Sequence, residues 1–168
     1  MTLDIAIDAD AEWDSSHDWA SLARSAATAA IAESAFPQLG QGERMVELSV
    51  RLATDAEVLA LNSEWRGKDK PTNVLSFPMS DERDLSRANV DGRELLLGDI
   101  ILARGVCETE ATEKGVTVEQ HATHLIVHGT LHLLGHDHHD DREAEDMEAR
   151  EVRALASLGI ANPYEVTA

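Results

Sequence analysis

Histidines are concentrated in one short stretch of the chain. Seven of the eight lie between His121 and His139, and residues 128–138 read H-G-T-L-H-L-L-G-H-D-H. On an α-helix, residues four apart lie on one face, one turn from each other. His128 and His132 have this spacing, so both imidazoles can reach a single metal ion.

The turn that follows can supply a third ligand. Gly135 tolerates the left-handed backbone conformation that ends a helix, and a reversal there can return His138 to the ion that His128 and His132 face. Three neutral nitrogens leave a fourth coordination position open, as in catalytic zinc sites, whereas structural zinc sites usually have four protein ligands. We therefore predict one zinc ion per chain, bound by these three histidines through nitrogens at ~2.0–2.1 Å.

The other polar residues of this stretch are compatible with more than one role. Asp137 fits two roles equally well, since it could orient a ligand histidine or cap the turn after Gly135. The remaining histidines are expected to lie beside the ligands, to face solvent or to be coincidental; they are His121, His124, His136 and His139.

The same spacing occurs in metzincin peptidases, whose motif is H-E-x-x-H-x-x-G-x-x-H. Those enzymes use the glutamate beside the first histidine as the general base, and Gly129 stands in its place here. Met147 could be mistaken for the methionine of the metzincin turn, but its helical context favours core packing. We infer a hydrolytic centre that needs no carboxylate at position 129.

The composition is that of one globular domain. The chain has 168 residues, 43% hydrophobic and 27% charged, which is enough to bury a core, and we expect a single domain over residues 1–168. The first residues lack the features of a signal peptide, and no apolar run approaches the ~18 residues of a membrane span. Cys107, the only cysteine, is expected to be a small apolar helix residue. We expect a cytoplasmic protein without a membrane association.

The net charge of −18 restricts the ways in which this chain can bind nucleic acid. Phosphate contacts dominate nucleic-acid affinity, so an acidic chain needs a local basic patch. Arg66, Lys68 and Lys70 form the obvious anion-facing patch, because two of the three lysines lie there. The alternative is an ordinary solvated loop after a helix.

The pattern of apolar residues predicts an α+β fold with one four-stranded sheet and about five helices. The metal site then lies on a helix and on the turn after it. Residues 80–94 are polar and aperiodic, and we expect a mobile loop or lid there. Strands are predicted at 3–8, 45–52, 73–77 and 95–103, and helices at 16–36, from Thr54 to about 65, at 105–114, from Thr117 through His132 and from Asp140 to Gly159. Capping boxes are predicted for Thr54 with Glu57, Thr117 with Gln120 and Asp140 with Glu143.

Three segments resemble the YbeY endoribonuclease family. They are residues 65–78, W-R-G-K-D-K-P-T-N-V-L-S-F-P, residues 97–100, L-G-D-I, and the histidine motif at 128–138. The first third of the chain and the last helix match the family only in layout. The resemblance implies a mixed four-stranded sheet with helices packed around it.

The resemblance also implies an activity and a set of site residues. It implies a single-strand-specific, metal-dependent endoribonuclease that takes part in 3′-end maturation of small-subunit (16S) rRNA and in ribosome quality control. Its partners would be ribosomal RNA, the small ribosomal subunit and assembly factors. His128, His132 and His138 take the zinc-ligand positions of the family, and Arg66 takes the position of its functionally important arginine.

The predicted site has a chemistry that suits this activity. An ion held by three histidines can lower the pKa of a bound water to about 7 and polarise a phosphoryl oxygen. Attack on phosphorus and removal of a proton from the ribose 2′-OH are both open to such a site. Arg66 is the candidate catalytic residue that binds the phosphate, because its planar guanidinium suits bidentate contact.

Three other functions compete with this interpretation. The first is a zincin-like peptidase or other metal hydrolase, which the absence of a glutamate beside His128 disfavours. The second is a non-catalytic ribosome-assembly factor whose zinc braces the fold, which the net charge of −18 favours. The third is a metal carrier, suggested by the additional histidines His136 and His139.

Overall fold

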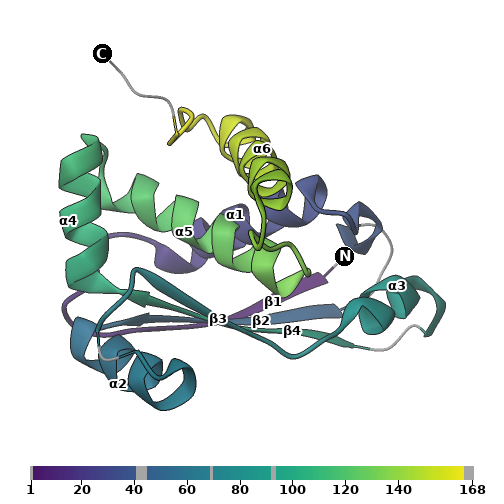
Figure 1. Ribbon diagram of the computed structural model, residues 1–168, viewed down its shortest axis with the longest axis horizontal. Coiled ribbons are helices and arrows are strands. Elements are labelled where there is room, and N and C mark those ends of the chain that lie inside the picture. Colours follow the sequence, from purple (N-terminus) through teal and green to yellow (C-terminus); the bar gives the residue numbers. More distant parts are fainter. Residues whose placement is uncertain (1, 41–44, 69, 92–93, 165–168) are drawn as a thin grey trace.

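The computed structural model of the protein describes residues 2–40, 45–68, 70–91 and 94–164. Its centre is a single open sheet of four strands in the order β1-β2-β4-β3. The first three of these are parallel neighbours, and β3 pairs antiparallel with β4 at one edge. The predicted mixed four-stranded sheet is therefore confirmed (Figure 1). The strands are β1 Thr2–Ala9, β2 Met45–Ala53, β3 Val74–Pro78 and β4 Leu95–Ala103.

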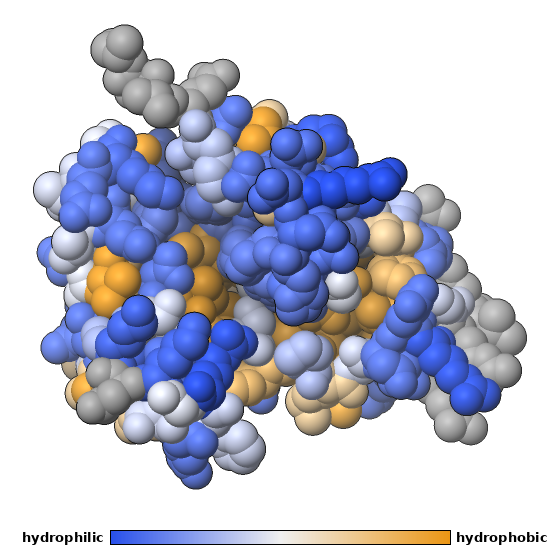
Figure 2. All heavy atoms as spheres, in the orientation of Figure 1, coloured by the Kyte–Doolittle hydropathy of each residue, from blue (hydrophilic) through white to orange (hydrophobic). Residues whose placement is uncertain are grey.

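Six α-helices surround the sheet in the described part of the chain. Helices α1, α5 and α6 lie over one face, with α5 next to the sheet, while α2 lies on the opposite side (Figure 1). In the same view, hydrophilic side chains cover most of the upper helices, and hydrophobic ones show between the helical layer and α2 (Figure 2). The helices are α1 Trp19–Glu33, α2 Asp55–Arg66, α3 Glu82–Asp91, α4 Arg104–Lys114, α5 Val118–Leu133 and α6 Asp141–Ser157, with a 3-10 turn at Pro37–Gly40.

The core lies between the sheet and the helical layer. Alternate residues of β2 are buried, as the apolar alternation predicts: Val46, Leu48, Val50 and Leu52. Four alanines on α1 are fully buried against the same core, and their small side chains let the helix approach closely: Ala23, Ala26, Ala27 and Ala30. Met147 belongs to this core, which confirms its predicted packing role. Cys107 is also buried there, and burial raises the pKa of its thiol to about 12.

Side-chain caps fix where the helices begin. Thr117 and Gln120 form a complete capping box at the start of α5, with both hydrogen bonds at 3.1 Å. Thr54 accepts from the backbone N–H of Glu57, but the Glu57 carboxylate pairs with Arg51, so only half of that predicted box exists. Helix α1 begins later than predicted because Asp18 caps it.

Only half of the predicted capping box forms at the start of α6, because the Glu143 carboxylate accepts from the backbone N–H of His139 and not from that of Asp140. The Asp140 side chain accepts from the backbone N–H of Glu143 at 2.8 Å.

None of the helices in the described ranges has both the length and the apolar composition needed to cross a membrane.

The prediction of a mobile loop at residues 80–94 is wrong for residues 82–91, which form α3; residues 92–93 lie outside the described residues. Asp81 and Asp84 cap the start of this helix reciprocally, each side chain accepting from the other's backbone N–H at 2.9 and 3.0 Å. Leu85 is 1% exposed and joins the core. Among the described side chains of α3, Leu85 anchors the helix to the core, and the reciprocal cap fixes where it starts.

Gly98 shapes β4 where it passes β3. Its φ is +141°, which side chains disfavour, and a Cβ there would lie 2.2 Å from the carbonyl oxygen of Phe77. The register between β2 and β4 also shifts at this point, between Glu47 and Leu48. The glycine of the L-G-D-I segment is thus required by backbone geometry.

We predict that Gly98→Ala destabilises the protein by about 3 kcal/mol, because it combines an unfavourable φ with a steric overlap. Urea unfolding followed by circular dichroism measures this change. Gly40→Ala is the matched control and should change stability by less than about 0.5 kcal/mol, because no atom of the described residues lies within 4 Å of its Cβ position. Equal unfolding midpoints for the two variants would contradict the prediction.

Candidate metal centre

The three histidines predicted as metal ligands lie together. The Nε2 atoms of His128 and His132 are 3.0 Å apart, and the ring of His138 lies 5.3 Å from that of His132, centre to centre. One nitrogen of each ring lies within 4.8 Å of the others. Nitrogens around a tetrahedral zinc ion are about 3.3 Å apart, so this donor set fits a metal ion after small side-chain movements.

The turn after α5 brings His138 into place. Gly135 has a φ of +89°, and its N–H donates to the carbonyl of His132 while the N–H of His136 donates to that of Leu131, both at 3.0 Å. These two bonds form a Schellman motif, which ends the helix and reverses the chain. The predicted role of Gly135 in the turn is confirmed.

Asp137 performs the capping role and also lies close to the ligand rings. Its Oδ1 accepts from the backbone N–H of His138 at 2.8 Å. The carboxylate lies 4.0 Å from Nδ1 of His132, 3.8 Å from Nδ1 of His138 and 2.8 Å from Nε2 of His139. Partial burial raises the pKa of Asp137, but this hydrogen bond and the neighbouring histidines outweigh it and lower the pKa.

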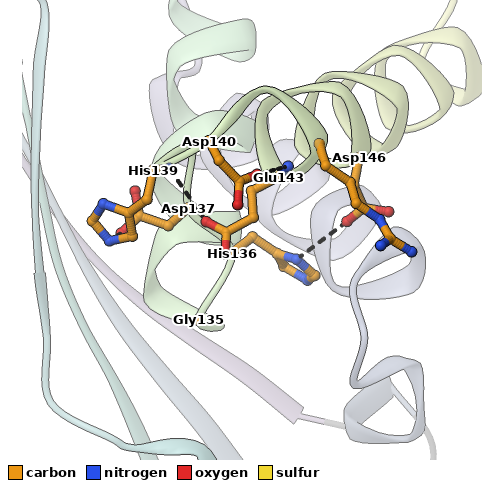
Figure 3. A pocket seen from close by; sticks show the side chains of 8 residues that line it. Gly135, His136, Asp137, His139, Asp140, Glu143 and Asp146 are labelled. Atoms are coloured by element: carbon orange, nitrogen blue, oxygen red, sulfur yellow. Dashed lines mark hydrogen bonds and ion pairs between the residues drawn. The ribbon is translucent and has the colours of Figure 1, made fainter.

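The two neighbouring histidines have different surroundings: His136 lies on the far side of the turn, whereas His139 lines the same cavity as the cluster. His136 lies toward Asp146, at 3.9 Å, on the far side of the turn (Figure 3). Its Nε2 accepts from the backbone N–H of Ala35, so His136 ties the turn to the end of α1. His139 has a side chain that is 80% exposed, and its backbone N–H donates to Glu143 (Figure 3). Neither is one of the three clustered histidines.

His132 is available in its neutral form. Burial, reinforced by the charge of His128, lowers the pKa of His132 to about 4. A neutral imidazole keeps a free lone pair, which is the form that binds metal ions. No proton therefore has to leave His132 at neutral pH when an ion binds.

Glu151 of α6 is a residue that the sequence analysis missed. It is 0% exposed, and its Oε1 accepts from Nδ1 of His128. Burial raises the pKa of Glu151, but hydrogen bonds from His128 and Tyr164, together with the nearby ring of His124, outweigh burial and lower the pKa to about 2. A signal was available, because Glu151 lies four residues after Met147 on the apolar face of its helix.

Arg66 lines the same cavity as the three histidines, although more than sixty residues separate them in the sequence. The cavity has a volume of about 650 Å³, and Thr72, Asn73 and Ser76 add polar groups to its wall. Arg66 itself is exposed and makes no ion pair within the described part of the chain. Lys68 and Lys70 are also exposed but do not line this cavity.

A second cavity, of about 340 Å³, borders His128 and His138 together with α6. Its wall includes the carboxylates of Asp140, Asp141 and Glu148. The candidate centre therefore borders one cavity that carries an arginine and another whose carboxylates repel anions.

Gly129 faces the sheet, not the candidate centre. A Cβ at this position would lie 3.0 Å from Cγ2 of Ile100 and 3.1 Å from Oγ of Ser76. The contact leaves no room for a glutamate side chain. Steric packing therefore accounts for the glycine at the position where metzincins carry their general base.

The fold and the site define the class of protein: an α+β domain with a candidate three-histidine metal centre beside a cavity. Within that class, the chain belongs to the YbeY endoribonuclease family, whose model, described as Endoribonuclease YbeY, matches residues 9–159.

Relatives over nearly the whole length support this membership. A protein of Sphingopyxis alaskensis named Endoribonuclease YbeY is 57% identical, over 96% of this chain and 97% of its own. A protein of the same name from Rhizorhabdus wittichii is 54% identical, over 98% of each chain. The solution structure of TM1509 from Thermotoga maritima covers 98% of this chain and 100% of its own at a TM-score of 0.54 and 22% identity, which shows a shared fold.

We predict that the purified protein binds one zinc ion per chain and that His132→Ala loses most of it, because two histidines cannot complete the donor set. Metal analysis after dialysis against zinc measures the content. His139→Ala is the matched control, since His139 is exposed and lies outside the cluster. Full zinc occupancy in His132→Ala would show that the ion binds elsewhere.

Proposed function

We propose that this protein is a zinc-dependent endoribonuclease that cleaves single-stranded RNA. The observation that carries the proposal is the placement of Arg66 and the three clustered histidines on one cavity. Membership of the YbeY family, whose curated relatives are named endoribonucleases, supports the same reaction.

The residues of the cavity have two different roles, metal binding and phosphate binding. His128, His132 and His138 would hold the ion, which supplies Lewis-acid activation of water and positive charge beside the phosphate. The Arg66 guanidinium binds the scissile phosphate, since its fork matches two phosphate oxygens. Arg66 also offers positive charge to the phosphate oxygens that become more negative in the transition state.

The shape of the site favours single strands. The volume of about 650 Å³ is within the range of pockets that enclose a small ligand. An unpaired nucleotide can splay its base and sugar to reach such a cavity, whereas an A-form duplex presents a rigid surface. The acidic second cavity repels the RNA backbone, so the strand enters from the Arg66 side.

The family also suggests a place for this activity in the cell. We infer that the enzyme matures the 3′ end of 16S rRNA and takes part in ribosome quality control in the cytoplasm, together with the small ribosomal subunit and assembly factors. A net charge of −18 would oppose general RNA binding. Such a charge suits an enzyme that a ribosomal partner brings to a single site.

We predict that zinc-loaded protein cleaves single-stranded RNA faster than a duplex of the same sequence and does not hydrolyse peptides. Gel assays on labelled RNA and a fluorogenic peptide panel measure the two activities. His128→Ala should abolish RNA cleavage. Peptide hydrolysis that His128→Ala removes would instead establish the zincin-like alternative.

We predict that Arg66→Ala lowers RNA cleavage by ~10²-fold, the effect of one lost charge-stabilising contact. Melting temperature and zinc content should stay close to the wild-type values, because Arg66 is exposed. Arg66→Lys should recover part of the rate, since an ammonium supplies charge without the planar fork.

The control for Arg66 is Arg83→Ala, which removes an exposed arginine outside the cavity and should leave cleavage unchanged. Two results would show that Arg66 does not act on the phosphate. One is a wild-type cleavage rate in Arg66→Ala; the other is early melting of this variant together with loss of zinc.

A further inference from the structure

Glu151 is a buried charge with two specific partners. Burying a carboxylate is costly unless its oxygens are paired and hydrogen-bonded. Here Oε1 accepts from Nδ1 of His128, and Oε2 accepts from the hydroxyl of Tyr164. Both oxygens of a side chain with no exposed surface are thus satisfied, and one partner is a candidate metal ligand.

Tyr164 belongs to the segment that follows α6, beyond the residues that match the family model. Its backbone N–H donates to Oδ1 of Asn162 at 2.8 Å, which shapes the local turn. The ring packs edge-on against His124, with centres 5.5 Å apart and planes at 89°. Although Tyr164 is 40% exposed, its hydroxyl points inward to Glu151.

The hydrogen bonds of this network have one consistent direction. Tyr164 donates its only hydroxyl proton to Glu151, so its oxygen is free to accept from Nε2 of His124, 3.3 Å away. His128 donates from Nδ1, which leaves the lone pair on its Nε2. That Nε2 is the nitrogen that faces His132 at 3.0 Å.

We propose that Glu151 and Tyr164 position His128 as a metal ligand. Glu151 holds the proton of His128 on Nδ1, fixes the ring orientation and makes Nε2 the ligand atom; Tyr164 fixes the Glu151 carboxylate from the other side. The inference rests on the proposed metal centre. It adds the C-terminal segment to the parts of the chain on which that centre depends.

The energetics favour this role over simple packing. A buried ionic group without a function is often no more stabilising than an apolar side chain of the same volume. A carboxylate behind a ligand histidine makes the imidazole a better donor, and loss of such a partner typically weakens metal binding by about 10–100-fold.

The test is the zinc dissociation constant of metal-stripped, full-length protein, measured by competition with a chromophoric chelator. Glu151→Gln should raise it by about 10–100-fold, and Tyr164→Phe, which keeps the ring, should raise it less. The double variant should bind zinc no more weakly than Glu151→Gln, because Tyr164 acts through Glu151. Glu145→Gln, an exposed residue of the same helix, is the matched control and should bind like the wild type.

Two further readouts separate positioning from packing. Substituted Co²⁺ should show an altered visible absorption band in both variants, because the ligand geometry changes. The melting temperature of the metal-free variants reports packing alone. A merely structural role would lower this temperature without changing the zinc affinity. If Glu151→Gln fails to fold, Tyr164→Phe provides the test, because this substitution removes only a hydroxyl group from a side chain that is partly exposed.

The outcomes also distinguish this inference from the metal centre itself. Suppose that Glu151→Gln and Tyr164→Phe both bind zinc with wild-type affinity while His132→Ala loses binding. This result would overturn the positioning role but would still support the three-histidine metal centre. Losses that multiply in the double variant would overturn the action of Tyr164 through Glu151. A wild-type protein that binds no zinc would overturn both proposals.

Discussion

The close contact of helix α5 with the sheet at Gly129 is the constraint on which the site depends. A side chain there would press on Ile100 and Ser76 at 3.0–3.1 Å and push the helix away. With glycine, one face of α5 lies against the sheet. His128 and His132, on a neighbouring face of the helix, then border the cavity beside β3.

Local signals predicted much of this arrangement. Alternating apolar residues located β2, and the Thr117–Gln120 capping box located the start of α5 correctly because both depend only on neighbouring residues. The reversal at Gly135 is equally local, since a Schellman motif is built from the last helical turn. These features were sufficient to predict that three histidines would meet.

Other features depend on contacts between distant segments, which no local pattern contains. The spacing of Glu151 from Met147 places it on the apolar face of α6, but only the packing of that helix on α5 shows that its partner is His128. Arg66, at the end of α2, lies on the histidine cavity because α5 packs against β3. Residues of β3 form part of the wall of the same cavity. Helix α3 was missed because its sequence is polar and shows no apolar periodicity, although Leu85 is buried.

We infer that three histidines form an open metal centre on the cavity that Arg66 lines. Diffraction from crystals of the zinc-loaded protein, measured at the zinc absorption edge, tests it most directly. We expect one anomalous peak per chain, bonded to nitrogens of His128, His132 and His138, with no fourth protein ligand. A peak elsewhere, or one closed by a fourth side chain such as Asp137, would contradict it.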